Sequence, residues 1–488
     1  MVVGEVIQER ELIIVGGGPG GYNAAIRAAQ LGVEVTLIEK GELGGICLSK
    51  GCIPSKLSAH TASKLSDYKH LQQIGIDTGE PSFNLDQHRK YMEQTVSALQ
   101  KGVESLCKAN KVEVINGTAS FMTGSRIGVE IGDTFEMYKY EKVIIASGVS
   151  SSVPDVFKMD SESDRIFTAQ TIYEIEEVPE HLLIYGTDYI ALEAATSFRA
   201  LGSSVTIIMD ETDGYGFDAD IEKELSRVLK KSKIKVMKNS VVDSVEANDE
   251  QVFIHLTKGE DEKLSVEGTH LLVSAGFTPN TKEIGIDALS IEIDESGFIV
   301  INEHSETSVK GVYAVGDVTF GPSLAVKAIK QGKVAAEHCA GRKSELNLRY
   351  IPTIVHTAPP IATVGLTEAV AVGEGFSVTT GQFSMSGNGY AGITGKKEGV
   401  VKVIKDSETN LLLGVHMIGH GAVEMITSGV TALEMAARDE DLMYGFFPHP
   451  SFNEGWLEAL ESLTGEAIHV TPGKQQKKSA AEPVGSRD

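Results

Sequence analysis

The feature that most constrains the fold is a glycine-rich turn between two short apolar runs near the N-terminus. LIIV at residues 12–15 is the first run, GGGPGG follows at 16–21, an alanine-rich helical stretch comes next, and VEVTLIE closes the unit at 33–39. This succession of strand, turn, helix and strand is the setting in which a G-x-G-x-x-G pattern binds a dinucleotide. We therefore predict a parallel α/β nucleotide-binding unit at this place.

Four residues have separate tasks in such a unit. Gly16 permits the tight turn, Gly18 lets the backbone approach a pyrophosphate, and Gly21 lets the helix pack on the strand. The helix N-terminus offers free N–H groups and a partial positive charge to the phosphates. Glu39 ends the second strand, where its carboxylate can accept hydrogen bonds from ribose hydroxyls. The alternative is a glycine-rich turn without a ligand, but the complete strand–helix–strand context favours the dinucleotide.

A pair of cysteines follows directly, in GELGGICLSKGCIPSK. On a straight helix the step from Cys47 to Cys52 rises about 7.5 Å, whereas a disulfide needs Cα atoms within about 7 Å. We therefore expect the helix to start or distort here, where Gly51 and Pro54 give a reason for it. A metal site needs more ligands than these two, and a structural disulfide is rare in the cytosol. The pair is predicted to be a redox-active dithiol, and no metal is predicted.

The rest of the composition excludes several classes of protein. The other two cysteines, Cys107 and Cys339, are isolated and predicted to be ordinary thiols, so the chain is no secreted disulfide framework. The formal net charge of −24 argues against nucleic acid and anionic membranes as partners. We see no signal peptide and no apolar run of about 18 residues, so a cytoplasmic location without a membrane span is expected. Residues 469–488 are polar and are predicted to be a disordered tail.

Together these motifs resemble those of the flavoprotein disulfide reductases, and within that family those of the dihydrolipoyl dehydrogenases. The resemblance runs from about residue 10 to residue 468, nearly the whole chain. The stretches that carry it are GGGPGGYNAA, GGICLSKGCIPSK, VIIASG at 143–148, VYAVGDV at 312–318, GPSLAVKA at 321–328 and HPSFNE at 449–454.

The resemblance implies that the first nucleotide unit binds FAD. Asp317 matches the family aspartate that holds the ribityl chain, and the backbone from about Leu324 lies near the flavin ring. Lys56 matches the lysine beside flavin N5, and Glu193 matches its buried carboxylate partner, a pairing that lets both remain charged. The FAD-binding residues expected are Gly16, Gly18, Gly21, Glu39, Lys56, Gly117, Ser147, Gly148, Asp317, Leu324 and Ala325.

HPSFNE places Glu454 five residues after His449, where the carboxylate could orient the imidazole of a general base. The resemblance implies that this histidine belongs to an interface domain and reaches the disulfide of the other subunit, so the chain is expected to be a homodimer. The family pattern is usually H-x-H-P-T, whereas this chain has Phe447 at the outer histidine and Ser451 at the threonine.

The implied reaction has two halves. A dithiol, either dihydrolipoamide or the lipoyl arm of a 2-oxoacid dehydrogenase complex, gives up a proton to His449 and attacks the disulfide at Cys47. Cys52, nearer the flavin, passes the electron pair to FAD, and NAD is the final acceptor in the family.

The second nucleotide unit departs from the family pattern at three places. It has the expected outline of a strand at 181–185, a turn, a helix and a strand at 204–208, but Asp188 stands where the turn needs its second glycine. Met209 stands where an acidic residue meets the NAD ribose, although Asp210 and Glu211 follow it. Phe277 stands where the family usually has arginine. The NAD-site residues in question are Gly186, Asp188, Ala191, Met209 and Gly276.

Two hypotheses follow from these departures. Either NAD still binds and the changes are tolerated, or the chain uses a nicotinamide cofactor poorly and exchanges electrons with another carrier. The absence of a nearby arginine disfavours NADP in either case.

The predicted fold class is α/β, with two Rossmann-like domains and an α+β C-terminal dimerisation domain. The predicted boundaries are 1–152 with 276–350 for the FAD domain, 153–275 for the NAD-like domain and 351–468 for the interface domain. In that last domain we expect strands at IPTIVHT, GVVKVIKD and LLLGVHMIG, and helices at about 420–437 and 453–463.

Three functions are compatible with these motifs. The first is a dihydrolipoyl dehydrogenase activity, the second a related disulfide reductase with another substrate or electron partner, and the third a non-catalytic flavoprotein that acts in assembly. The third is disfavoured by five intact positions, Cys47, Cys52, Lys56, His449 and Glu454.

Overall fold

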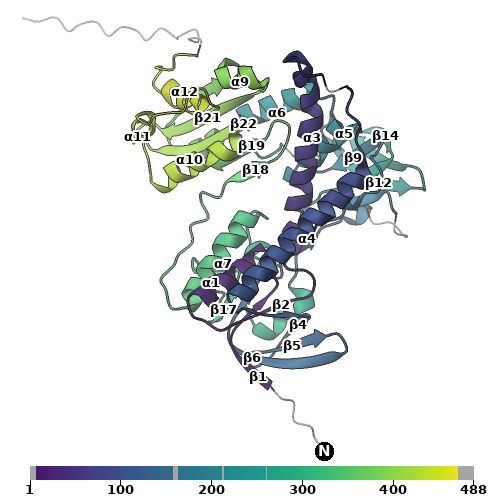
Figure 1. Cartoon of the computed structure of the whole chain (residues 1–488), viewed down its shortest axis with the longest axis vertical. Helices are drawn as coiled ribbons and strands as arrows, with labels where there is room; N and C mark the ends of the chain where they lie inside the picture. The colour runs from purple at the N-terminus through teal and green to yellow at the C-terminus, as the bar shows by residue number, and fades with distance from the viewer. Residues whose placement is uncertain (1–6, 78, 158–162, 211–213, 260, 471–488) are drawn as a thin grey trace, which may run out of the picture. The chain divides into compact units, whose positions relative to one another are not determined.

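The computed structural model describes residues 7–77, 79–157, 163–210, 214–259 and 261–470 (Figure 1). Two compact units make up the chain: a larger one of 1–217 with 225–361, and a smaller one of 218–224 with 362–488. Of the predicted tail at 469–488, all but the first two residues lie outside the described part. No helix in the described ranges is both long and apolar enough to cross a membrane.

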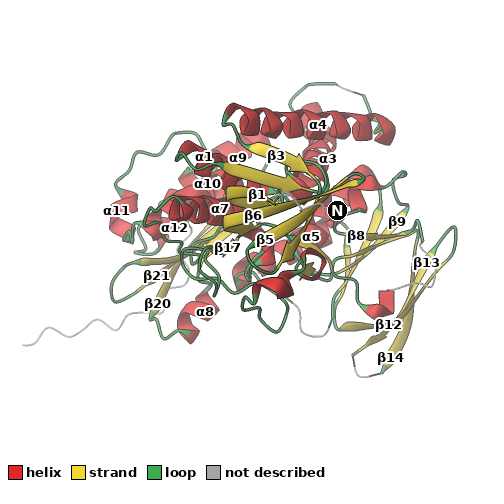
Figure 2. Ribbon diagram, turned by 90° about the horizontal axis from the view of Figure 1, so that it is seen from below, coloured by secondary structure: helices red, strands yellow, loops and turns green. Residues whose placement is uncertain are grey.

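The first sheet of the larger unit is centred on β1 (Ile7–Val15), which pairs in parallel with β2 (Val35–Glu39) and β6 (Thr134–Ile145). The other strands are β3 (Glu113–Asn116), β4 (Thr118–Met122), β5 (Arg126–Ile131) and β17 (Val312–Ala314). Figure 2 shows β1, β6 and β5 side by side, with α4 (Leu85–Ala109) beyond them. This parallel core, flanked by helices, confirms the predicted α/β class.

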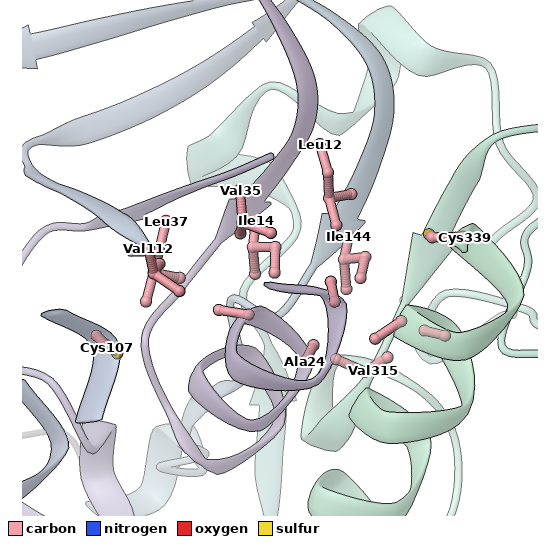
Figure 3. Close-up of a cluster of buried hydrophobic side chains, with 14 of the residues drawn as sticks. Leu12, Ile14, Ala24, Val35, Leu37, Cys107, Val112, Ile144, Val315 and Cys339 are labelled. Carbon is pink, nitrogen blue, oxygen red and sulfur yellow. The ribbon is translucent and has the colours of Figure 1, made fainter. Parts of the chain in front are cut away.

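Both faces of β1 are covered. Leu12 and Ile14 pack on one face against α1 (Pro19–Gln30) and α7 (Ala325–Cys339), as Figure 3 shows. Ile13 and Val15 pack on the other face with residues of β4, β5 and β6. A strand buried on both faces reads as a continuous apolar run, which is why LIIV signals a parallel sheet. Cys107 and Cys339 belong to the first of these clusters and are fully or almost fully buried.

The second sheet of the larger unit has the parallel order β11 (Lys235–Met237), β10 (Ser204–Ile208), β9 (His181–Tyr185), β15 (His270–Val273) and β8 (Ile166–Thr168). β9 and β10 coincide with the strands predicted at 181–185 and 204–208. An antiparallel meander of β12 (Ser240–Ala247), β13 (Val252–Lys258) and β14 (Glu262–Gly268) follows. The helices of this region are α5 (Tyr189–Leu201) and α6 (Ala219–Lys231), whose first turn clusters with the smaller unit.

The smaller unit contains strands in the order β19 (Ile361–Gly365), β22 (Leu412–Gly419), β21 (Gly399–Asp406) and β20 (Val378–Ser384). Its helices include α8 (Glu368–Gly373), α9 (Gly389–Thr394), α10 (Ala422–Glu434), α11 (Asp439–Met443) and α12 (Glu454–Ser462). β21 covers the same residues as the predicted strand GVVKVIKD, and α10 and α12 lie within the predicted helices. β18 (Thr353–Val355), predicted from IPTIVHT, clusters with the larger unit.

Candidate active site

A cavity of about 560 Å³ lies in the larger unit, where the first glycine turn meets the cysteine-bearing segment. Cofactor and substrate sites commonly have volumes in this range. The predicted residues that line it are Gly16, Gly18, Glu39, Cys47, Cys52, Lys56, Gly117, Ser147, Gly148, Glu193, Asp317 and Ala325. The fold therefore brings the predicted nucleotide-binding residues and the predicted dithiol into one cavity.

The first glycine turn has the geometry that its motif requires. Gly16 adopts φ +103°, and a Cβ there would lie 2.3 Å from the carbonyl oxygen of Ala146, so no other residue fits. A Cβ at Gly21 would lie 1.8 Å from the carbonyl oxygen of Gly16. Gly21 therefore acts in packing, as predicted for the third glycine, and does not line the cavity. Gly18 begins α1, and no side chain caps this helix, which leaves its first amides available to an anion.

Glu39 lies at the end of β2, at the mouth of the same turn. One carboxylate oxygen, Oε2, accepts a hydrogen bond from the Gly17 amide at 2.5 Å, and Oε1 accepts one from the Gly41 amide at 2.7 Å. A carboxylate has about four lone-pair sites, so each oxygen retains capacity for a ribose hydroxyl.

Asp317 gives the test of whether FAD fits. Its Oδ1 is buried and has no hydrogen-bond partner within the described ranges, which is costly unless a ligand donates to it. Burial raises the pKa of Asp317, and the nearby Lys327 ammonium opposes the shift. An acceptor facing the cavity suits a ribityl hydroxyl, so the residues present fit FAD. Of the two residues predicted near the flavin ring, Ala325 lines the cavity, whereas Leu324 is the N-cap residue of α7 and does not.

The cysteines lie on either side of a break between two helices. Cys47 is in α2 (Gly45–Ser49) and Cys52 is the first residue of α3 (Cys52–Gln73), with Gly51 between the helices. The predicted distortion is thus present. Pro54 lies in the first turn of α3, where a missing N–H breaks no helical hydrogen bond. Both cysteines are free thiols in this structure.

The two thiols have opposite pKa shifts. A hydrogen bond with Cys47 lowers the pKa of Cys52 to about 7, helped by the Lys56 ammonium and opposed by burial. The same hydrogen bond, together with burial, raises the pKa of Cys47. The first proton therefore leaves Cys52, and the resulting thiolate is stabilised while Cys47 remains a thiol.

Lys56 and Glu193 form a charged pair between α3 and α5. The Lys56 Nζ lies 2.9 Å from both carboxylate oxygens of Glu193, whose side chain is 1% exposed. The backbone amide of His356 donates to the same carboxylate at 2.9 Å. These donors satisfy the buried carboxylate, which in turn holds the lysine in place.

The predicted base and its partner lie together in the smaller unit. The Nδ1 of His449 is 2.7 Å from Oε1 of Glu454, and the Ser451 amide donates to Oε2 at 2.9 Å. Burial raises the pKa of Glu454, but these hydrogen bonds outweigh it and lower the pKa below its ordinary value. The His449 side chain is 80% exposed, so its other nitrogen is open to a reacting group.

The predicted NAD residues have different surroundings. Gly186 has φ +126°, as a tight turn requires, and Ala191 is buried in α5. Asp188 caps α5, because its Oδ1 accepts a hydrogen bond from the Ala191 amide at 2.9 Å. Met209 is 1% exposed, so its side chain is part of the interior. Glu211, the acidic residue two positions further on, lies outside the described residues. Gly276 has φ +87° and precedes Phe277, which lines the cavity.

Several cavity residues were not predicted from the sequence. Tyr189 follows Asp188 directly, and its hydroxyl donates to the Ser323 carbonyl at 3.0 Å. Its place in the second turn was a signal that could have identified it. The others come from a strand, a turn and short 3₁₀ helices without a motif; they include Ala119, Gln170, Tyr173 and Glu283.

Comparisons with known proteins identify the family of the chain. A family model described as pyridine nucleotide-disulphide oxidoreductase matches residues 10–332, and the dimerisation-domain model of that family matches 351–460. A dihydrolipoyl dehydrogenase of Geobacillus stearothermophilus is 34% identical over 471 residues, covering 96% of this chain and 99% of that protein. One from Thermus scotoductus is 38% identical over 466 residues, covering 94% and 98%. Among solved structures, LpdA from Mycobacterium tuberculosis has a TM-score of 0.86 at 25% identity, covering 94% of this chain and 100% of that one.

Proposed function

Since the chain belongs to the pyridine nucleotide-disulphide oxidoreductase family, we propose that it oxidises a dithiol of the dihydrolipoamide class through Cys47 and Cys52. It is an FAD-dependent flavoprotein disulfide oxidoreductase of the dihydrolipoyl dehydrogenase type. The observation that carries the proposal is the placement of the cysteine pair with Lys56 and Glu193 in the cavity that the first glycine turn lines.

The dithiol reaction follows from the chemistry of the pair. A substrate thiolate attacks Sγ of Cys47 in the Cys47–Cys52 disulfide, and the bond between the two cysteines breaks. The electron pair of that bond stays on Cys52 as a thiolate, which the pKa of about 7 favours. The second substrate thiolate then attacks the substrate sulfur bound to Cys47, which releases the cyclic disulfide and leaves Cys47 reduced.

The chain supplies the groups that hold FAD, which when bound accepts the electron pair from the reduced cysteines. The residues that would hold it are Gly16, Gly18, Glu39, Lys56 and Asp317. Lys56 places its ammonium group beside the thiolate, and Glu193 keeps Lys56 in position.

We assign proton removal to His449 of a second subunit. Its support is the exposed imidazole held by Glu454, together with the match of residues 351–460 to the family dimerisation domain. The first thiol of the substrate gives its proton to Nε2, because Nδ1 is engaged by the Glu454 carboxylate. A homodimer in which each subunit completes the site of the other is therefore part of the proposal. The dithiol is either free dihydrolipoamide or the lipoyl arm of a 2-oxoacid dehydrogenase complex.

The electron acceptor has two candidates. NAD is the acceptor that the family resemblance predicts. A different carrier is the second candidate, and the observation that favours it is the carboxylate of Asp188 at the N-terminus of α5.

The test is anaerobic rapid mixing of the FAD-loaded enzyme with dihydrolipoamide, with flavin reduction followed by absorbance. We expect fast reduction in the wild type and none in Cys47→Ser, which should still bind FAD. Cys107→Ala is the matched control, since Cys107 is buried in the core. Flavin reduction that survives in Cys47→Ser, or a wild type that dihydrolipoamide does not reduce, would overturn the proposal.

A further inference from the structure

The chain contains two glycine turns with similar backbone geometry, one in each nucleotide unit. The second turn can therefore be compared residue by residue with the first. Gly16 and Gly186 both have positive φ, and a Cβ on either would collide with a carbonyl oxygen, that of Ala146 at 2.3 Å or that of Ser274 at 2.1 Å. Ala146 and Ser274 therefore occupy equivalent places, at the ends of β6 and β15.

The residues that begin the two helices also have the same backbone. The N-cap residue of α1 is Gly18, with φ −67° and ψ −175°, and that of α5 is Asp188, with φ −69° and ψ 175°. Any residue can adopt this conformation. A Cβ at Gly18 would have only Gly45 nearby, at 4.0 Å. Neither backbone nor space therefore demands glycine at this position. What the glycine provides is an uncapped helix N-terminus, where a pyrophosphate can approach.

In the second turn, the carboxylate of Asp188 occupies the corresponding position at the N-terminus of α5. Asp188 Oδ1 accepts a hydrogen bond from the Ala191 amide at 2.9 Å, an amide of the kind that holds phosphate oxygens in nucleotide sites. The Ser274 hydroxyl lies within hydrogen-bond distance of both oxygens, 2.9 Å from Oδ1 and 2.8 Å from Oδ2. Ser274 is 6% exposed, so its hydroxyl is held in this orientation. Two residues that distinguish the second turn from the first, Asp188 for Gly18 and Ser274 for Ala146, thus bond to each other.

We infer that the carboxylate of Asp188, held in place by Ser274, occupies the anion-binding position of the second nucleotide unit. In this position it excludes the pyrophosphate of NAD(H) and NADP(H). A bound pyrophosphate would have to displace the carboxylate from the Ala191 amide or lie against it with like charge, and each option is unfavourable. The ribose end adds to this effect, because the buried Met209 offers no carboxylate to the ribose hydroxyls. The pair is therefore a specificity determinant, and the residues of this unit do not fit a nicotinamide dinucleotide.

The inference rests on the proposed dithiol reaction, and the experiment separates the two. The FAD-loaded, full-length enzyme is prepared as wild type, Asp188→Asn, Asp188→Gly, Ser274→Ala and the double variant Asp188→Gly/Ser274→Ala. The double variant recreates in the second turn the residue pair of the first turn. For each protein, NAD⁺ binding is measured by calorimetry, and anaerobic flavin reduction is measured separately with NADH and with dihydrolipoamide.

We expect the double variant to bind NAD⁺ at least about tenfold more tightly than the wild type and to be reduced faster by NADH. Asp188→Asn, which loses the charge but can still cap the helix, should gain less than Asp188→Gly. Reduction by dihydrolipoamide should be unchanged in all variants, because glycine is well tolerated at an N-cap position and neither Asp188 nor Ser274 has a role in the proposed dithiol reaction.

The matched control is Asn84→Gly, which removes a comparable side-chain cap from α4, where Asn84 accepts from the Gln87 amide at 2.9 Å. It should leave NAD⁺ binding unchanged. Equal NAD⁺ affinity in the wild type and the double variant would overturn the inference, as would NADH reduction of the wild type as fast as reduction by dihydrolipoamide. Failure of dihydrolipoamide to reduce any of these proteins would instead refute the proposed function.

Discussion

Lys56 donates to both oxygens of Glu193, and its charge also lowers the pKa of Cys52, whereas the Glu193 charge raises it. These opposite effects on the pKa of Cys52 can be tested by substituting each residue separately. Lys56→Met should move the titration midpoint of the Cys52 thiolate upward from about 7, by about one pH unit or more, because a nearby positive charge is lost. Glu193→Gln should move it downward. The measurement is the ultraviolet thiolate absorbance of the dithionite-reduced enzyme against pH. Shifts in the same direction for both variants would contradict the assignment.

The imidazole of His449 should be needed for the dithiol reaction but for nothing else. His449→Gln is expected to slow flavin reduction by dihydrolipoamide about a hundredfold or more, as the loss of a general base does. FAD content should not change. The chain offers a matched control in a second histidine–carboxylate pair, the exposed His469 and the buried Glu458, with a 2.5 Å separation between Nδ1 and Oε1. If His469→Gln slows the reaction as much as His449→Gln, the role assigned to His449 is wrong.

Single residues were predictable where a motif carries them and unpredictable where only the fold makes them neighbours. Cys47, Cys52 and His449 could be named because their spacing in the chain identifies them. Ser274 lies 86 positions from Asp188 along the chain, and only the parallel pairing of β15 with β9 brings its hydroxyl to the second turn. No local pattern in the sequence encodes that contact.

At the scale of elements, a buried lysine connects β21 to the segment that begins α6. The Nζ of Lys402 lies 2.8 Å from Asp218, 2.7 Å from Asp220 and 2.6 Å from Glu368. Lys402 and Asp218 each have a side chain that is 1% exposed. Removing one partner of such a buried pair leaves the other charge uncompensated, which destabilises a protein by about 3–5 kcal/mol.

We therefore expect Lys402→Met to lower the free energy of unfolding of the smaller unit by about 3 kcal/mol or more at neutral pH. Burial raises the pKa of Asp218, but the hydrogen bond from Lys402 and backbone amides lower it overall, so the stabilisation is present above the unfolded pKa and is lost on acidification through the folded one. The difference between wild type and variant in urea unfolding should thus shrink at acid pH. Lys397→Met, at an exposed lysine, is the control. A difference that stays constant with pH would contradict this account.

Elements were predicted best where a short apolar run marks them. GVVKVIKD became β21, which is buried along almost its whole length, and Lys402 can be fully buried within it because its charge is paired. The meander β12–β14 was not predicted, since its strands follow the second nucleotide unit without a motif of their own. The association of residues 218–224 with the smaller unit was also unforeseen, because it depends on contacts over more than a hundred positions.

At the scale of the whole molecule, the order of the motifs predicted the family and the succession of two nucleotide units and a dimerisation region. The predicted domain boundaries stay a prediction. What order cannot give is the selectivity of each unit, because selectivity depends on single side chains such as the N-cap residue, which is Gly18 in the first turn and Asp188 in the second.

The last prediction concerns the surface through which two chains associate. The smaller unit exposes three large apolar side chains close in sequence to His449: Met435 at 75%, Tyr444 at 91% and Phe446 at 106% relative exposure. All lie within the stretch that matches the family dimerisation domain. Large apolar side chains exposed to water are candidates for burial at an interface, and a second copy that covers this segment would bring its own surface to the His449 imidazole.

We therefore expect the wild type to sediment as a dimer of the 52.2 kDa chain, and Phe446→Asp to shift the equilibrium to the monomer, because association would bury the new charge. The variant should keep its FAD, since the cavity lies within one chain, but should lose dithiol turnover in proportion to the monomer fraction. Phe135→Asp is the control, as Phe135 is 56% exposed in the hairpin of β5 and β6, outside the dimerisation match. A monomeric Phe446→Asp that turns over dihydrolipoamide at the wild-type rate would show that each subunit is complete by itself, and the assignment of His449 to a partner's disulfide would then have to be abandoned.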